Sequence, residues 1–224
     1  MNILAIETAT PACAMALRTT QGAEFEARVD DERHHTEALT PGIRDLLEQA
    51  GLSARALDRI VVDRGPGLFT GLRVGIATAI GLGLGANAEL VGVTSLELLA
   101  HGAHDQGVRG ALVSCVDGRR GEVFAQTFDL DVGVTTLSEP TVATPQELFE
   151  EWAERKVTIT GDGAARYRAV LLRADAVSIF DQLVPPPLQA LRLGALRSPE
   201  GSIQPLYLRE ADAVANFATR DRNS

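Results

Sequence analysis

The sequence predicts an α/β fold made of two similar halves. Short apolar segments that favour strands alternate along the chain with segments of helical periodicity, as in layered α/β proteins. Residues 3–17 and 111–128 each predict a β-hairpin whose first strand ends in an acid, Glu7 in one and Asp117 in the other. The two acids lie 117 − 7 = 110 residues apart, about half of the 224-residue chain. Duplication of one unit is the simplest explanation, although two such hairpins also arise by chance.

The composition is that of an ordinary soluble globular protein, with 45% apolar and 23% charged residues. The net charge of −9 disfavours binding of free nucleic acid by the chain alone. Cys13 and Cys115 are the two cysteines, with no C-x-x-C motif and no histidine cluster nearby, which excludes a disulfide framework and a cysteine-based zinc site and fits a reducing cytoplasm. The N-terminus lacks the basic segment of a signal peptide, and the longest uncharged run, Val74–Ala88, is too short and glycine-rich for a membrane span. We therefore predict a cytoplasmic protein that does not bind membranes.

The elements of the first half follow from periodicity and from helix-terminal residues. A helix from about Leu39 to Ala50 has apolar residues along one face and ends at Gly51. Pro41 lies near its predicted start, where a missing amide costs least. A strand at 60–62 then leads through a glycine-rich loop into a helix at about 70–85.

A polar stretch at 101–110 is the predicted boundary between the halves. It follows a strand at 90–93 and a helix that begins with the capping-box pair of Thr94 and Glu97. We therefore divide the chain into an N-terminal subdomain, residues 1–106, and a C-terminal subdomain with a flexible tail, residues 107–224.

The second half continues the alternation of helices and strands. Residues 144–147 combine a threonine cap, a proline and a capping acid, which predict a helix running to about Arg155. A strand at 157–160 follows, and the prolines at 185–187 precede a leucine-rich helix. We expect a loose tail after Arg209.

The strongest local motif runs from Gly65 to Gly83 and reads GPGLFTGLRVGIATAIGLG. A glycine-rich loop before a helix N-terminus offers backbone amides to a phosphate. The motif is not a P-loop, however, and a tight connection that needs glycine explains the same residues. On sequence alone both interpretations stay open. The residues of the candidate nucleotide or phosphate loop are Glu7, Thr8, Thr10, Gly65 and Gly67.

Small residues recur at every fourth position of the helix that follows this loop. They form two series: Gly71, Gly75 and Ala79, and Ala77, Gly81 and Gly85. A glycine inside a helix costs roughly 0.8–1 kcal/mol relative to alanine, so close packing must offset that cost. Because apolar residues surround the helix almost completely, we expect one face to cover its own sheet and the other to contact a further helix, within the chain or in a partner.

No residue cluster predicts a metal site or a catalytic site. His34 and His35 are adjacent, so they point to different faces of a helix. Glu7, Asp117 and Asp162 suit a hydrated Mg²⁺ near phosphates, but acids at strand ends also serve solubility. The chain lacks the G-x-S-x-G and H-E-x-x-H motifs of hydrolases. We therefore predict no metal ligand and no catalytic residue.

Several motifs, in order along the chain, closely resemble bacterial TsaB proteins. They are ILAIETAT at the start, the Gly65–Gly83 motif, GVTSLELLA from Gly92, VDGRRGEVF from Val116 and PLYLR ending at Arg209. The resemblance covers nearly the whole chain and implies an actin/hexokinase-type fold of two ribonuclease-H-like subdomains. It also implies a subunit of the machinery that makes threonylcarbamoyladenosine next to the anticodon of tRNA, with the homologous transferase TsaD and the small ATPase TsaE as partners.

The chain departs from its relative TsaD where that protein binds its metal. TsaD-like proteins carry GVNHLEGH with two metal-binding histidines, and here Ser95 and Leu99 stand at those positions. Asp117–Arg120 also replaces a glycine-rich phosphate loop. These departures imply a non-catalytic subunit that binds no cofactor tightly, with ATP or ADP and Mg²⁺ at the partner interface left open. A stand-alone kinase-like or metallopeptidase-like enzyme of the same fold stays as the alternative.

The resemblance further predicts a docking surface, because TsaB-like proteins pair through their N-terminal helices. We expect the helices at about 39–50 and 70–85 to contact a TsaD-like chain, or a second copy of this chain when TsaD is absent. The acidic charge implies that tRNA is reached only through the complex. The predicted interface residues are Leu39, Ile43, Leu46, Thr70, Gly71, Arg73, Gly75 and Ala79.

Overall fold

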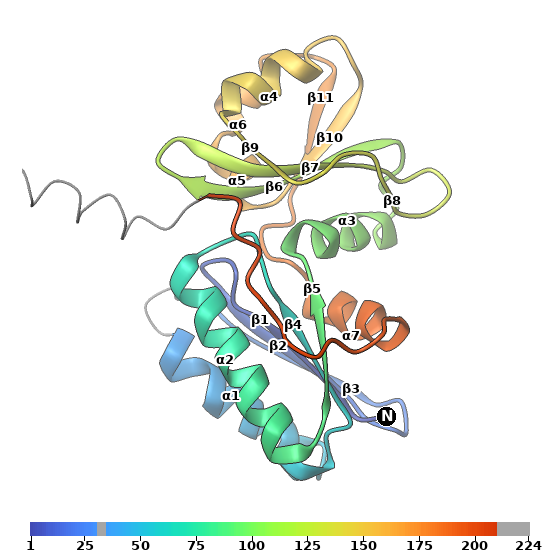
Figure 1. The fold of residues 1–224 in the computed structure, drawn as a ribbon. Coiled ribbons are helices and arrows are strands. Elements are labelled where there is room, and N and C mark those ends of the chain that lie inside the picture. Colours follow the sequence, from blue (N-terminus) through green and yellow to red (C-terminus); the bar gives the residue numbers. More distant parts are fainter. Residues whose placement is uncertain (31–34, 210–224) are drawn as a thin grey trace, which may run out of the picture.

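The computed structural model describes residues 1–30 and 35–209, which form two lobes, each built on one mixed sheet (Figure 1). The first sheet has the order β3-β2-β1-β4-β5. Its strands are β1 (Ile3–Glu7), β2 (Cys13–Arg18), β3 (Glu24–Val29), β4 (Arg59–Asp63) and β5 (Glu89–Val93). β1 is antiparallel to β2 and parallel to β4.

The second sheet repeats this pattern. Its order is β11-β10-β6-β7-β8, with β9 also paired to β7. The strands are β6 (Ala111–Arg119), β7 (Glu122–Asp129), β8 (Thr135–Thr136), β9 (Thr141–Ala143), β10 (Val157–Thr160) and β11 (Val177–Phe180). β6 is antiparallel to β7 and parallel to β10, as β1 is to β2 and β4. The shared topology confirms that the two predicted hairpins are equivalent units.

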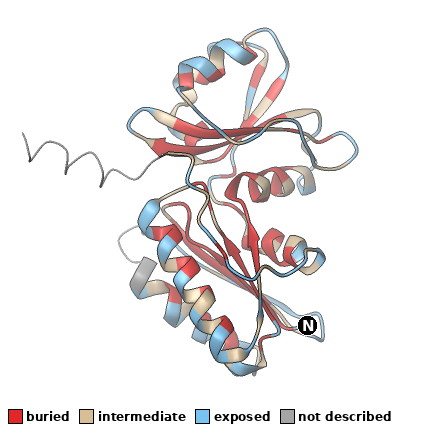
Figure 2. Cartoon of the chain, viewed as in Figure 1, coloured by how far each residue is buried: buried red, intermediate tan, exposed pale blue. Residues whose placement is uncertain are grey.

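Helices cover both faces of the first sheet. α1 (His35–Gln49) and α2 (Phe69–Ala86) pack on one face, and α7 (Pro187–Leu196) packs on the other. A 3₁₀ turn, η2 (Ala54–Ala56), precedes β4. Alternate residues of β1 serve the two faces: Leu4 and Ile6 join the α1–α2 core, whereas Ile3 and Ala5 join the α7 core. Figure 2 shows the buried residues concentrated in the strands and the inward helix faces.

α3 (Ser95–Asp105) lies between the two sheets. Leu98 packs into the α7 core of the first lobe, while Leu96 and Leu99 pack against the second sheet. The outer face of the second sheet carries α4 (Pro145–Trp152), α5 (Asp162–Arg166) and α6 (Arg168–Leu171). α3 is therefore the shared core helix of the two lobes.

α7 lies in the first lobe although it follows every strand of the second in sequence. Its Gly194 approaches Val61 so closely that an added Cβ would lie 2.1 Å from a Val61 methyl. The assignment of all of 107–224 to the second subdomain is therefore corrected for this helix. A leucine-rich helical pattern predicts burial without indicating which sheet receives it.

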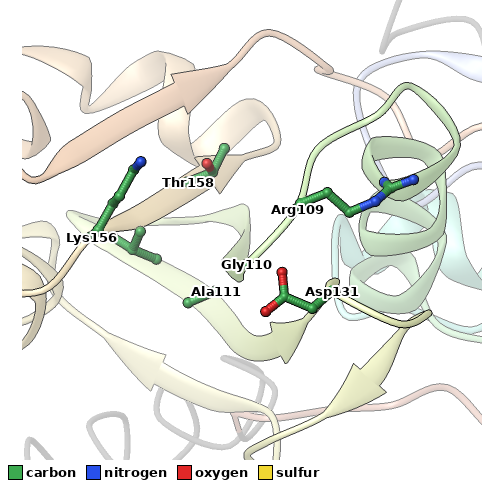
Figure 3. Close-up of a pocket in the computed structure, with 7 residues that line it drawn as sticks. Arg109, Gly110, Ala111, Asp131, Lys156 and Thr158 are labelled. Carbon is green, nitrogen blue, oxygen red and sulfur yellow. The ribbon is translucent and has the colours of Figure 1, made fainter.

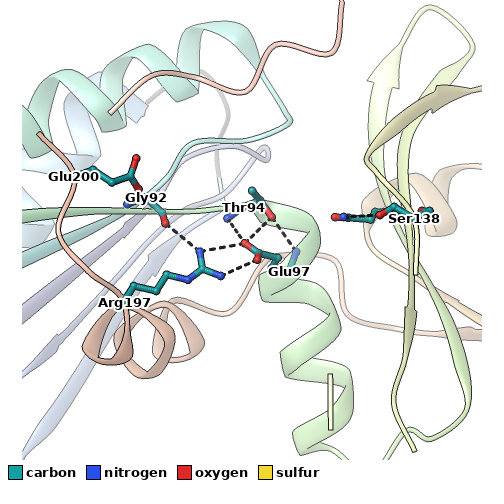
Figure 4. Close-up of polar contacts among 7 residues, drawn as sticks. Gly92, Thr94, Glu97, Ser138, Arg197 and Glu200 are labelled. Atoms are coloured by element: carbon teal, nitrogen blue, oxygen red, sulfur yellow. Dashed lines mark hydrogen bonds and ion pairs between the residues drawn. The ribbon is translucent and has the colours of Figure 1, made fainter. Parts of the chain in front are cut away.

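The chain after α7 forms a strap, residues 197–209, that returns along β5 to the second lobe (Figure 1). Glu200 N donates to Leu90 O at 2.8 Å, and Leu206 N donates to Arg64 O at 2.7 Å. Arg197 binds Glu97 at 2.7 Å, the acid of the α3 capping box, as Figure 4 shows. The strap thus covers the edge of the first sheet and joins it to α3.

Two predicted element boundaries change in the structure. α1 begins at His35, so Pro41 lies inside the helix; it removes one backbone bond, and burial of the apolar face offsets that loss. α3 extends to Asp105, so most of the predicted polar linker at 101–110 is helical or caps a helix. α2 is long and apolar enough to span a membrane by length and composition, a test that core helices also pass, and one of its faces is buried on the sheet. Both predicted capping boxes are confirmed.

Candidate functional site

The carboxyl ends of the two sheets face each other between the lobes and bring four acids to one region. Glu7 ends β1, and Asp63 ends β4. Asp117 lies near the end of β6, and Asp162 begins α5 directly after β10. The negative charge of Asp162 acts on Glu7 across the junction. Sequence reasoning missed Asp63, although its place after an apolar strand is the same signal that pointed to Glu7.

The first pair, Glu7 and Asp63, is completely buried. Ala9 N donates to Glu7 Oε1 at 2.9 Å. Gly65 N donates to Asp63 Oδ1 at 2.7 Å, and Ser95 Oγ lies 3.0 Å from the same oxygen. Burial raises the pKa of both carboxyls, and the charge of Asp63 raises the pKa of Glu7 further. The pair therefore favours a protonated form.

The second pair, Asp117 and Asp162, has cationic neighbours. Asp117 Oδ2 lies 3.5 Å from Arg119 Nη1 and 3.4 Å from Arg166 Nη1. Asp162 Oδ1 accepts a hydrogen bond from Asp117 N at 2.9 Å. Burial raises the pKa of Asp162 to about 6, so this carboxyl is ionised at neutral pH.

The candidate phosphate loop is packed against its own lobe. Thr8 Oγ1 donates to Gly71 O at 2.8 Å, and Leu68 N donates to Ala9 O at 2.7 Å. A Cβ at Gly67 would lie 2.1 Å from Ala9 O, which explains the glycine by close contact of two backbones. The hydroxyl of Thr10 is buried and has no hydrogen-bond partner among the described residues. The tight connection accounts for these contacts, and nucleotide binding stays a prediction.

The positions that correspond to the TsaD histidines have structural roles. Ser95 Oγ lies 2.9 Å from Pro66 O as well as near Asp63. Leu99 is completely buried in the core between α3 and the second sheet. Over residues 1–30 and 35–209, no three His, Cys, Asp or Glu side chains form a metal-binding group. His34 lies outside the described residues.

The two small-residue series of α2 lie on different faces of the helix. Gly71, Gly75 and Ala79 are buried, and a Cβ at Gly75 would lie 2.3 Å from Thr8 Oγ1. The other series is exposed, with no atom near a Cβ placed at Gly81 or Gly85. Figure 2 shows exposed segments along the outer side of the helix. The series that packs on the sheet is therefore distinct from the one open to a partner.

This geometry corrects the choice of interface residues. Six of the predicted eight are buried inside the first lobe: Leu39, Ile43, Leu46, Gly71, Gly75 and Ala79. Thr70 and Arg73 are exposed. The error has one cause, since helical spacing identifies an apolar face without showing whether the chain itself covers that face.

The open surface of α2 continues into neighbouring features. An apolar groove of about 390 Å³ lies between α1 and α2, and Ile43, Leu47 and Leu82 line it. At the other end of α2, the Phe69 ring stacks on Tyr207 of the strap at 5.4 Å. The Arg73 guanidinium lies 3.8 Å from the Phe69 ring centre. We call the exposed surface from Phe69 to Gly85 the α2 face.

A second pocket, of about 270 Å³, lies at the opposite end of the second sheet. Figure 3 shows Arg109 directed towards a helix and away from Lys156. Arg109 donates to the carbonyls of His104 and Val108 at 2.8 and 2.7 Å. The charged groups that line this pocket do not converge on one point, so we assign the pocket no ligand.

The two facing lobes of shared topology define a protein of the actin/hexokinase fold class, with two ribonuclease-H-like subdomains. Residues 30–170 match the sequence model of a family described as TsaD, tRNA N6-adenosine threonylcarbamoyltransferase. The TsaB protein of Escherichia coli K12, described as a tRNA threonylcarbamoyladenosine biosynthesis protein, is 36% identical over 68% of this chain and 69% of its own length. The chain belongs to the TsaB family.

Two further relatives match nearly the whole chain. The TsaB protein of Bacillus subtilis 168 is 27% identical over 97% of this chain and 98% of its own. A solved Pseudomonas aeruginosa structure, described as similar to the peptidase YeaZ, has a TM-score of 0.81 at 27% identity over 93% of this chain and 99% of its own. These matches confirm the resemblance inferred from the motifs.

Proposed function

We propose that this chain is a non-catalytic subunit in the biosynthesis of threonylcarbamoyladenosine in tRNA, acting in the cytoplasm. In this proposal it docks on a TsaD-like transferase and activates it, and a TsaE-like ATPase joins the complex. Alone, the chain pairs with a second copy of itself. Membership of the TsaB family supports the pathway, and the match to the transferase family model supports a partner of the same fold.

The single observation that carries the docking proposal is the α2 face. Leu84 is 82% exposed, and Ala77, Gly81 and Gly85 leave the helix backbone open to close approach. Glycines inside a helix cost stability that nothing within the lobe offsets at these exposed positions. A second helix packed against the stripe would gain contacts with the backbone itself. A partner of the same fold offers such a helix in a matching position.

The non-catalytic role is supported by what replaces the metal ligands. The Ser95 hydroxyl lies within hydrogen-bond distance of Asp63 and of Pro66 O, and Leu99 is buried in the core between α3 and the second sheet. In the packed loop beside Glu7, the amides of Ala9, Gly65 and Leu68 are bonded within the protein. We therefore place ATP or ADP with Mg²⁺, where the complex uses them, at the partner interface. With a net charge of −9, the chain reaches tRNA through the complex.

The test is Gly81→Leu, measured for affinity to the cognate TsaD-like chain by calorimetry. A Cβ at Gly81 meets no atom within 4 Å, so the variant should melt at or above the wild-type temperature. On the α2 face, the added side chain should separate the two helices and weaken binding at least tenfold. The reconstituted complex should then form less threonylcarbamoyladenosine.

The matched control is Glu150→Leu, which adds an exposed leucine to α4 on the outer side of the second lobe. Its affinity for the partner should equal that of the wild type. A well-folded Gly81→Leu protein with unchanged affinity contradicts docking through the α2 face.

A further inference from the structure

We propose that Glu7 carries a proton at neutral pH and donates it from Oε2 to Oδ2 of Asp63, so that one shared proton joins the two buried carboxyl groups. This proton site goes beyond the docking role and is independent of it. It requires neither a metal nor a nucleotide.

The proposal rests first on the four carboxyl oxygens of the pair. Glu7 Oε1 accepts from Ala9 N, and Asp63 Oδ1 accepts from Gly65 N and from the Ser95 hydroxyl. Glu7 Oε2 and Asp63 Oδ2 are buried and receive no donor from the described residues. Two ionised carboxylates cannot satisfy each other, because both are only acceptors. A single proton between these oxygens satisfies both.

The surroundings of the pair contain no compensating cation. Among the described residues, no ion pair joins Glu7 or Asp63 to an arginine, lysine or histidine. Asp162 of α5 faces Glu7, and Glu97 of α3 faces Asp63, where Arg197 already pairs with Glu97. Both facing groups are acidic and oppose a second negative charge.

The remaining neighbours do not neutralise the pair either. Burial raises the pKa of the Cys13 thiol on β2 to about 12, so this group is uncharged. Arg64, which follows Asp63, lies 3.7 Å from Glu200 of the strap. Leaving both carboxylates ionised would therefore place two unpaired charges in the core, which is far costlier than one.

The donors identify which carboxyl holds the proton. Asp63 accepts two hydrogen bonds that stabilise its negative charge, whereas Glu7 accepts one. The pKa of Glu7 is raised well above its ordinary value by burial and by the charge of Asp63. The negative charge thus belongs on Asp63 and the proton on Glu7.

The shared proton fixes the connection that precedes α2. Asp63 Oδ1 holds the amide of Gly65, and the Ser95 hydroxyl lies within hydrogen-bond distance of both Asp63 and Pro66 O. Loss of the proton would add a second charge beside this loop. The pair therefore positions the first turn of α2 relative to α3, and it does so best at neutral and lower pH.

The test compares the pH dependence of unfolding in the full-length wild type and in Glu7→Gln. In the wild type, Glu7 is protonated when folded and ionised when unfolded, so unfolding releases a proton and its equilibrium constant rises about tenfold per pH unit from this group. Stability should therefore fall as pH rises through neutrality, until Glu7 ionises in the folded protein. Glutamine keeps a donor to Asp63 without a titrating proton, so its slope should be smaller by one proton.

Asp162→Asn is the matched control, because Asp162 is an acid of the second lobe whose pKa is also raised by burial. The pKa of Asp162 is raised to about 6, so its titration ends near neutral pH and this variant should keep the wild-type slope above about pH 7. An equal slope in Glu7→Gln and wild type overturns the proposal.

Two further measurements keep the proposal testable. Stabilisation of the wild type by Mg²⁺ or Ca²⁺, absent in Glu7→Gln and reversed by chelator, would place a cation between the oxygens and overturn it. If Glu7→Gln does not fold, the infrared carbonyl band of a protonated carboxyl is sought in the wild type at neutral pH. Its presence in the folded state and loss on unfolding support the proposal, and its absence overturns it.

Discussion

Glu7 and Asp63 end β1 and β4 of the first lobe, and Asp117 and Asp162 lie near the ends of the equivalent strands β6 and β10, yet the two pairs have different surroundings. The first pair is fully buried among acids and backbone donors. In the second, Asp117 lies near two partly exposed arginines. Because the strand topology is shared, burial and the neighbouring groups account for the difference between the two pairs.

The helices that follow the two pairs differ as well. α2 has 18 residues and one open face, whereas α5 has 5 residues. The long helix α2, over a tightly packed loop, leaves the first lobe with an exposed helix face, which we propose as its docking surface. The duplicated unit has thus diverged into a lobe that we expect to bind a partner and a lobe whose acids keep ionic neighbours.

The largest expected effect comes from removing the acceptor of the first pair. Asp63→Ala leaves Gly65 N and the proposed proton of Glu7 without their buried acceptor, while the Ser95 hydroxyl keeps Pro66 O. Each such group costs about 1–3 kcal/mol, so we expect a loss of about 3–5 kcal/mol in urea unfolding at neutral pH.

Asp162→Ala, at the equivalent position of the second lobe, provides the comparison for that value. Its carboxylate accepts from Asp117 N, and the site is more open to water. We expect a smaller loss of about 1–3 kcal/mol. Equal losses in the two alanine variants would show that the surroundings of the pairs do not differ in energy.

The next expected effect is a change in stability whose sign differs between the two faces of α2. Gly75→Ala brings a Cβ within 2.3 Å of Thr8 Oγ1, the residue after Glu7, and should destabilise the fold by about 1–3 kcal/mol. Gly81→Ala meets no neighbour within 4 Å and should stabilise it by about 0.5–1 kcal/mol, because alanine favours the helix. Thermal unfolding of both variants measures these two changes in stability. A shift of the same sign in both would remove the distinction between a packed face and an open face.

Much of the fold follows from local pattern. The apolar strands ending in Glu7 and Asp117 predicted both hairpins, and the capping boxes at Thr94 and Thr144 predicted two helix starts. These features depend on residues close together in the sequence. The return of α7 to the first lobe does not, because its leucines would fit either sheet.

The site was less predictable for a related reason. Both small-residue series of α2 repeat every fourth residue, so their spacing is identical. Only the position of Thr8, opposite Gly75 in space, identifies the packed series. The partnership of Glu7 with Asp63 likewise depends on the parallel pairing of β1 and β4, which joins residues 56 positions apart (63 − 7 = 56).

The smallest expected loss of stability comes from a substitution in the second pair. Asp117→Asn removes the charge that faces Arg119 and Arg166, whose side chains are 39% and 54% exposed. Asparagine keeps an oxygen for the hydrogen bond from Arg119 N, which lies 3.0 Å from Asp117 Oδ1. Asp117 itself is buried, but water screens its pairs with the exposed arginines, so urea unfolding should change by no more than about 1 kcal/mol, and added salt should reduce the difference. A loss as large as that of Asp63→Ala would show that the second pair is as essential to its lobe as the first, and that its arginines act as buried partners despite their exposure.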